Sequence, residues 1–172
     1  LNIQSRLDEA IEFSELIRRS GFEPGVHVIS HATGSATPAI AAALHIKPQD
    51  QTLMIHKIFT ADGAPVIYCL DIVPLQFASV DFQKMALDPQ DLAVPIYHLL
   101  ERWFNQAVAY LIADIEARVA DDHVAGALDY RRNGPILLVE QTGYNSEDQP
   151  VFFTQEYYRP GYIQFRLPRR LG

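Results

Sequence analysis

Four side chains capable of acid, base or nucleophile chemistry lie in one β-rich stretch, Leu53 to Pro74. They are His56, Lys57, Cys69 and Asp71. The dipeptide Asp62-Gly63 divides this stretch into two runs of β-branched and aromatic residues, which is typical of a hairpin. An ammonium group in an apolar strand must pair, reach water or bind a ligand. The sequence therefore predicts a hairpin that forms one wall of a ligand pocket.

The length of the hairpin loop decides which residue lies opposite Lys57. An odd number of loop residues places Lys57 opposite Cys69 and diagonal to Asp71, whereas a two-residue loop places it opposite Tyr68, because a one-residue slip exchanges the faces of a strand. We expect the odd loop, since it brings Lys57 and Asp71 to one face. On that face the lysine either contacts a ligand or forms a surface ion pair with Asp71.

A loop of small polar residues, Thr33-Gly34-Ser35, offers a second place for a ligand. It precedes Thr37 and Pro38, which favour the N-cap and first turn of a short helix. Free backbone N–H groups and the positive end of the helix dipole would attract an anion there. Simple capping and a turn need the same residues.

Further candidate ligand contacts come from a predicted helix and from the end of the chain. They are Tyr97, Glu156, Tyr158, Arg159 and Tyr162. Arg159 suits a bidentate contact with a carboxylate, and the tyrosines combine an apolar ring with a hydroxyl. Packing at the rim and surface ion pairs are the alternatives. Glu140 and Glu156 lie in consecutive predicted strands, where they could face one another, although acid/base catalysis would need a shifted pKa.

No pattern indicates a metal, a cofactor or a catalytic residue. His27 and His31 share strand parity but lack further ligands at metal-binding spacing. The sequence Asp121-Asp122-His123 is typical of acids that open a helix. No P-loop, dinucleotide-binding or nucleophile-elbow motif is present. Cys69 has no adjacent base, so we interpret it as a small buried hydrophobe.

The elements expected around these residues alternate between helices and hairpins. Helices are predicted over residues 6–19, 37–44, 81–86, 95–104 and 121–130. Strands are predicted from residue 26, over both arms of the 53–74 hairpin, and over 108–119, 136–144, 151–158 and 162–167. Hairpins require antiparallel pairing, and the helices must cover a sheet face. This order predicts an α+β domain with a mostly antiparallel sheet.

Length, composition and charge exclude several classes of protein. The 172 residues suit one domain, and 48% hydrophobic content is ordinary for a globular protein. No apolar run is long enough to span a bilayer, so we expect no membrane contact. The net charge of −7 argues against binding nucleic acid directly. A single cysteine suits a reducing cytoplasm. Because the chain lacks an initiator methionine, we expect it to be part of a longer protein.

Six segments, in order and at their spacing, resemble one protein family. They are 13–15 with 19–21 (FSE and RSG), 36–44 (ATPAIAAAL), 62–66 (DGAPV), 95–100 (PIYHLL), 113–117 (ADIEA) and 158–165 (YRPGYIQF). Together they resemble the effector-binding UTRA domain of GntR-type transcription regulators of the HutC branch, which has a chorismate-lyase-like fold. The resemblance covers nearly the whole chain.

The resemblance implies a bacterial, cytoplasmic regulator that forms a homodimer and binds a small-molecule metabolite. Operator DNA would be contacted only by a winged helix-turn-helix domain that is missing from this sequence. Residues 1–172 would be one ligand-sensing domain, with 1–20 as the segment that follows the linker. The candidate ligand-binding residues are Thr33, Gly34, Ser35, Lys57, Phe59, Cys69, Tyr97, Glu156, Tyr158, Arg159 and Tyr162.

Departures from the family pattern bear on the effector. Many members that sense sugar phosphates have two arginines where this chain has Lys57 and Phe59. Cys69 replaces a frequent glutamate, and Gly161 replaces an acid. The implied pocket is less cationic and more apolar, suited to an aromatic, amine or carboxylate metabolite. The alternatives are a chorismate-lyase-like enzyme for a small carboxylate, which should carry pocket arginines, and an interaction module with a filled apolar interior.

Overall fold

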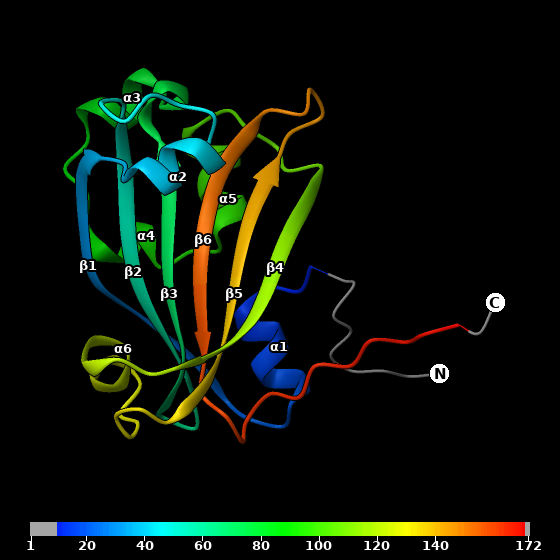
Figure 1. The fold of residues 1–172 in the computed structure, drawn as a ribbon. Helices are drawn as coiled ribbons and strands as arrows, with labels where there is room; N and C mark the ends of the chain where they lie inside the picture. The colour runs from blue at the N-terminus through cyan, green and yellow to red at the C-terminus, as the bar shows by residue number, and fades with distance from the viewer. Residues whose placement is uncertain (1–9, 171–172) are drawn as a thin grey trace.

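The computed structural model describes residues 10–170, which form a six-stranded antiparallel sheet with helices on both faces (Figure 1). The strand order is β1-β2-β3-β6-β5-β4. The strands are β1 Pro24–Ser35, β2 Gln51–Ala61, β3 Ala64–Pro74, β4 Tyr110–Val119, β5 Pro135–Tyr144 and β6 Pro150–Tyr158. All five neighbouring pairs are antiparallel. The predicted α+β class is confirmed.

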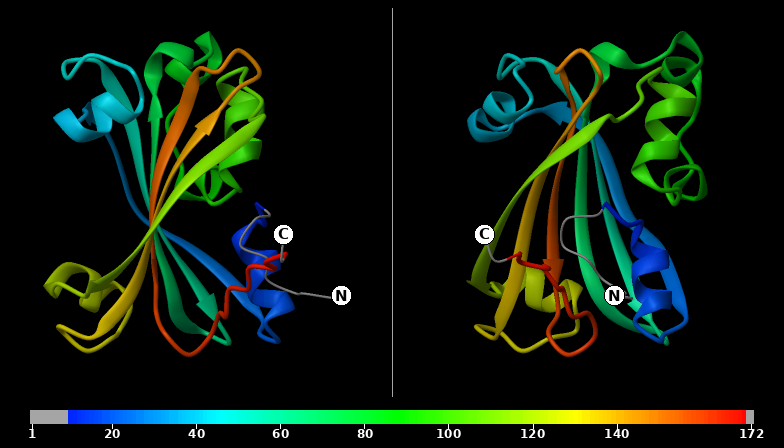
Figure 2. Two further views of the ribbon diagram at one scale, coloured as in Figure 1. Left: turned by 45° about the vertical axis from the view of Figure 1, so that its right-hand side comes forward. Right: turned by 90° about the vertical axis from the view of Figure 1, so that its right-hand side faces the viewer.

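The helices divide between the two faces of this sheet (Figure 2). They are α1 Phe13–Arg19, α2 Pro38–Ala43, η1 Leu75–Phe77, α3 Val80–Lys84, α4 Pro89–Leu92, α5 Ile96–Trp103 and α6 Asp122–Ala127. Helices α1 and α5 lie on one side of the sheet, and α2 and α6 lie on the other (Figure 2). We call the side under α1 and α5 the cavity face. Alternate residues of each strand point to it, because successive strand side chains alternate in direction.

The β2–β3 hairpin reaches the expected register by an unexpected route. Lys57 lies opposite Cys69, as predicted, but the loop is the two-residue turn Asp62-Gly63, so the predicted odd loop is wrong. Both turn residues have positive φ, 49° and 83°, as a tight hairpin turn of this kind requires. The odd residue is instead Val66, which forms a β-bulge. Val66 and Ile67 are both buried in the same cluster beneath α1, which stabilises the bulge.

Two sequence predictions about the ends of strands are wrong. Residues Thr33 to Ser35 form the last part of β1 rather than a loop, and the Thr52 hydroxyl donates to the Gly34 carbonyl oxygen at 2.9 Å. The strand predicted over 162–167 is only a single bridge at Arg166. Because β6 is paired on both sides, with β3 and β5, the segment that follows it has no adjacent edge to join. Phe165 packs on the cluster beneath α1 instead.

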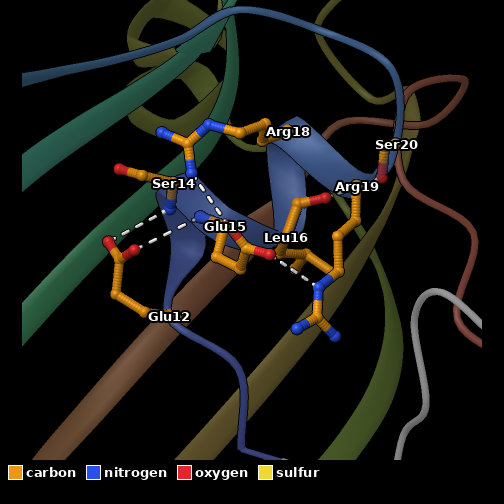
Figure 3. A network of polar contacts seen from close by, with 7 residues as sticks. All are labelled: Glu12, Ser14, Glu15, Leu16, Arg18, Arg19 and Ser20. Carbon is orange, nitrogen blue, oxygen red and sulfur yellow. Dashed lines mark hydrogen bonds and ion pairs between the residues drawn. The ribbon is translucent and has the colours of Figure 1, made fainter.

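Local capping fixes the position of α1, which is shorter than predicted (Figure 3). The carboxylate of Glu12 accepts from the backbone N–H groups of Ser14 and Glu15 at 3.1 and 3.2 Å, so the helix begins at Phe13. Residues 6–9 of the predicted helix lie outside the described part of the chain. Exposed Glu15 pairs with Arg18 and Arg19, and such surface ion pairs add little to stability. Burial of the apolar side of α1 against the sheet therefore dominates its attachment.

The remaining helix predictions are confirmed with small changes at the ends. Thr37 caps α2, accepting from the Ile40 N–H, and Pro38 is its first residue. Asp121 caps α6 by accepting from the Val124 N–H at 2.8 Å, which confirms the interpretation of the acids there as a helix start. Between residues 10 and 170, none of the helices combines the length and the apolar character that crossing a bilayer requires.

Candidate functional site

A cavity of about 100 Å³ lies on the cavity face, bounded by α1, α5 and the sheet. Its lining comes from the chain around α1, from α5 and the residue before it, from strands β2 to β6, and from the C-terminal segment. The lining residues are Ala10, Ile11, Glu12, Phe13, Leu16, Lys57, Phe59, Asp71, Pro95, Ile96, Tyr97, Leu111, Ala113, Ile115, Val139, Gln141, Phe152, Thr154, Glu156, Tyr158 and Phe165. An interaction module with a filled interior would lack such a space.

The walls of the cavity are apolar and rich in aromatic rings. Phe13 of α1 packs on Phe59 of β2 with ring centroids 4.6 Å apart. Phe165 meets the Tyr158 ring edge-on at 5.0 Å, and Tyr97 of α5 meets Phe152 edge-on at 6.1 Å. Six aromatic rings line the cavity in all, since each of these pairs contributes two. A ligand body that fits here must be largely apolar.

A buried ion pair forms one part of the cavity floor. The Lys57 Nζ lies 2.9 Å from Asp71 Oδ2 and donates to the Val94 carbonyl oxygen at 3.0 Å. The two side chains are only 2% and 4% exposed, so this is neither the predicted surface pair nor a free cation. Removal of one partner would leave a buried charge without its counterion, which typically costs about 3–5 kcal/mol.

Cys69 lies beneath this pair and does not line the cavity. Its Sγ donates to Asp71 Oδ1 at 3.4 Å and lies 3.2 Å from the Thr154 hydroxyl. Burial raises the pKa of the Cys69 thiol well above its ordinary value, and the nearby carboxylates of Asp71 and Glu156 raise it further. The protonated thiol therefore orients Asp71, and its predicted role as a small buried residue is confirmed.

Glu156 is the second buried acid of the floor, opposite Cys69 in the β3–β6 pairing. Its two oxygens accept from the Gln141 side-chain amide and from the Tyr158 hydroxyl, the latter at 2.6 Å. Burial raises the pKa of Glu156 to about 8, although both of these hydrogen bonds act to lower it. Its donors suit an ionised carboxylate, but desolvation outweighs them, so at neutral pH the proton is retained.

The two cavity tyrosines stay neutral. Burial raises the pKa of Tyr97 to about 12, with a smaller contribution from the carboxylates of Glu156 and Asp71. Burial also raises the pKa of Tyr158 well above its ordinary value, and Glu156 adds to the effect. Both hydroxyls therefore act as hydrogen-bond donors or acceptors rather than as bases.

The structure brings five of the eleven predicted ligand-binding residues together around the cavity. They are Lys57, Phe59, Tyr97, Glu156 and Tyr158. Thr33, Gly34 and Ser35 do not line it, because they continue β1 along the sheet edge. Arg159 and Tyr162 also lie outside the lining. Arg159 donates to the Leu128 carbonyl oxygen at 3.2 Å, and its guanidinium covers the rings of Tyr130 and Tyr162.

Several lining residues were not among those predicted from the sequence. Asp71, Thr154 and Gln141 form a row across β3, β6 and β5, set by the registers Asp71↔Thr154 and Gln141↔Thr154. Alternation along β4 was visible in the sequence and places Leu111, Ala113 and Ile115 on one face. Nothing in the sequence indicated that this strand lies next to β5.

Two expectations about which titratable residues share a face of the sheet are wrong. Glu140 lies opposite Gln155, whose amide donates to it at 2.9 Å, while Glu156 lies opposite Val139, so the two acids point to different faces. His27 and His31 do not share a face, because β1 has an irregularity between Val28 and Ser30. No group of three or more histidine, cysteine or acidic residues within the described chain is arranged to hold a metal ion.

Comparison with known proteins places this geometry in a family. The chain is 27% identical over 170 residues to the HTH-type transcriptional regulator Rv0792c of Mycobacterium tuberculosis. That alignment covers 92% of this chain but only 58% of the regulator, so the chain spans little more than half of the relative's length.

Solved structures share the fold at low sequence identity. The effector domain of PhnF from Mycobacterium smegmatis superimposes with a TM-score of 0.80 at 17% identity, over 96% of this chain and 99% of that one. A GntR-family transcriptional regulator from Enterococcus faecalis gives a TM-score of 0.72 at 20% identity, over 84% of this chain and 100% of that one. The fold expected from the family resemblance is thus confirmed. A family model described as UTRA domain matches residues 19–164, and the chain therefore belongs to the UTRA domain family.

Proposed function

We propose that this chain is the small-molecule effector-binding domain of a bacterial GntR-family transcription regulator of the HutC type. The observation that carries the proposal is the cavity under α1, with two buried carboxylates, a buried lysine and six aromatic rings in its lining. Burying ionisable side chains is costly in a structural core, and buried ionisable side chains are therefore concentrated at functional sites. The enzyme alternative is not favoured, since no arginine lines the cavity of the described chain.

In this proposal the protein acts in the bacterial cytoplasm, and operator DNA is contacted by a helix-turn-helix domain joined to this one, not by the chain itself. The net charge of −7 supports that division, because a surface that binds phosphates needs excess basic residues. The similarity to a regulator of which this chain spans 58% supports it as well.

Helix α1 couples the cavity to the rest of the regulator. The chain around α1 contributes Ile11, Glu12, Phe13 and Leu16 to the lining, so a bound ligand would touch it directly. A ligand shifts a conformational equilibrium only through different contacts in the two states. Contacts with α1 supply such a difference, and the segment before α1 leads toward the proposed linker.

The regulator acts as a homodimer, and edge strand β4 supplies the interface. Besides Ile115, which borders the cavity, three apolar side chains of β4 are exposed: Tyr110, Ile112 and Val119. A ten-residue edge strand that exposes apolar groups is suited to pairing with a second copy. Ile112→Lys should shift the mass measured by analytical ultracentrifugation from dimer to monomer. Ile29→Lys, which changes an exposed residue of the opposite edge strand, is the matched control.

A metabolite thermal-shift screen tests the effector-binding function. A ligand at 100 times its Kd should stabilise the domain by roughly 2.7 kcal/mol. Ala113→Phe should abolish the shift, because Ala113 lines the cavity and a phenyl ring would fill it. Ala117→Phe adds the same ring further along the same strand, outside the lining, and should leave the shift unchanged. A ligand that stabilises the wild type and Ala113→Phe equally would show that the cavity is not the binding site.

A further inference from the structure

We propose that the effector is a small organic cation, an amine with an apolar body, whose ammonium group lies against Glu156. This inference rests on the proposed effector-binding function and names the chemical class of the ligand. It follows from which charges in the cavity already have partners, from the nature of the walls, and from the size of the space.

Within the described chain, the lining has one cationic side chain, and a buried carboxylate already neutralises its charge. Lys57 lies between Asp71 Oδ2 and the Val94 carbonyl oxygen, at 2.9 and 3.0 Å, and is almost completely buried. An anionic ligand would place a second negative charge beside the one ammonium group that already neutralises Asp71, so one of the two anions would be left without a counterion. The anionic ligand would also lie close to the carboxyl group of Glu156. The cavity therefore disfavours phosphates and carboxylates.

The two remaining acids of the lining differ in availability. Glu12 stands at the start of α1, where its carboxylate accepts from two backbone N–H groups (Figure 3). Glu156 is buried and is held by two neutral donors, Gln141 and Tyr158. Each carboxylate oxygen can accept more than one hydrogen bond, so Glu156 retains capacity for a further donor. The two donors already favour the ionised form of Glu156, and a cation placed beside it would favour that form further.

The walls favour the same class of ligand. The faces of aromatic rings carry partial negative charge and attract ammonium groups. Phe59, Tyr97 and Tyr158 line the cavity from β2, α5 and β6, and three more phenyl rings complete the wall. A polyhydroxylated ligand would leave most of its hydroxyls unpaired against such walls. An empty cavity of about 150 Å³ accepts benzene, so a space of about 100 Å³ limits the buried part of the ligand to at most one ring or a short chain.

Binding of a cation to Glu156 should release a proton. The groups near Glu156 are Asp71 and Cys69 on β3, Tyr97 on α5, and its hydrogen-bond donors on β5 and β6; Lys57 lies beyond Cys69 in the same row of the sheet. Burial keeps the pKa of Glu156 at about 8, so the free domain holds the proton at pH 7. An ammonium group stabilises the carboxylate and lowers this pKa. Affinity for the amine should therefore rise with pH up to about 8, whereas affinity for a neutral ligand should not.

The test is calorimetric titration of the domain with isosteric sets of probes. Each set has an amine, an alcohol and a carboxylate on one body: butyl, cyclohexyl, benzyl or 2-phenylethyl. For at least one body the amine should bind at least about tenfold more tightly than the alcohol. Hydrogen bonds between charged groups are stronger than neutral ones by roughly the free energy that corresponds to a tenfold change in Kd. Titration at pH 7 in two buffers of different ionisation enthalpy should show proton release for the amine alone.

Glu156→Gln keeps the shape and should remove both the amine preference and the proton release. If that variant does not fold, proton release by the wild type still decides the matter. The inference is overturned if carboxylates bind as well as amines, if no amine binds, or if amine binding releases no proton. These outcomes differ from failure of the effector-binding function, which the metabolite screen with Ala113→Phe tests without regard to ligand charge.

Discussion

Replacement of Glu156 by glutamine should change how the stability of the domain depends on pH. The pKa of Glu156 rises from an ordinary value of 4.5 to about 8 in the folded chain. Between these values the unfolded chain gives up a proton that the folded chain keeps. The folded state therefore loses relative stability as pH rises from about 4.5 to about 8, and the loss stops above that pH.

The size of this effect follows from the shift. One pKa unit corresponds to about 1.36 kcal/mol, so a rise from 4.5 to about 8 amounts to up to about 5 kcal/mol. Natural domains are stable by about 5–15 kcal/mol in total, so the effect is a large share of the whole. The glutamine side chain of the variant cannot ionise, and rotation of the Tyr158 hydroxyl lets it keep a hydrogen bond to the new amide.

Urea unfolding of the wild type and of Glu156→Gln at half-unit steps from pH 4.5 to 9 would measure the difference. The stability of the variant relative to the wild type should rise with a slope of up to about 1.4 kcal/mol per pH unit and level off near pH 8. Glu140→Gln, on the opposite face of the same strand pair, controls for the substitution itself. Parallel curves for wild type and Glu156→Gln would refute the reasoning that burial keeps this acid protonated.

Three further outcomes are expected. Lys57→Met should lower the free energy of unfolding in urea by about 3–5 kcal/mol, because it leaves the buried Asp71 carboxylate without its counterion. The double variant Lys57→Met/Asp71→Leu should recover part of that loss, and equal losses in the single and double variants would contradict this explanation. Desolvation lowers the pKa of His56, so the contribution of His56 to stability should fall as pH drops below about 6.5, and the thermal stability of His56→Gln relative to the wild type should rise as pH drops from 7 to 5; parallel curves for the two proteins would exclude this role of His56. Gly143→Ala should destabilise by about 1–3 kcal/mol and displace Phe152, whose ring would overlap the new Cβ; unchanged chemical unfolding would argue against that contact.

The features that the sequence predicted correctly are those fixed by neighbouring residues. The Asp62-Gly63 turn and the Thr37 cap each depend on the chemistry of a few residues in a row. Lys57 lies on the expected face because of a bulge at Val66, not because of the length of the loop. Packing beneath α1 favours that bulge, and this contact is not visible in the local sequence.

What could not be predicted depends on contacts between distant segments. Glu156 was a candidate ligand contact, but its hydrogen bond with Gln141 requires the β5–β6 register. The row from Asp71 through Thr154 requires β3 to lie beside β6, which is far away in sequence. Thr33 to Ser35 are small polar residues, which occur both in anion-binding loops and at the end of an edge strand, so the sequence favoured the wrong structure. Only the length of the β1–β2 ladder distinguishes them.

Strand β4 both borders the cavity and forms an outer edge of the sheet. Leu111, Ala113 and Ile115 face the cavity, and on its other side β4 has no neighbouring strand within residues 10–170. A ligand that displaces β4 would therefore alter the edge presented to a partner chain. By thermodynamic reciprocity, a partner that fixes β4 would change ligand affinity by the same factor. Apparent effector affinity would then depend on protein concentration, and titrations at nanomolar and micromolar protein would report different values.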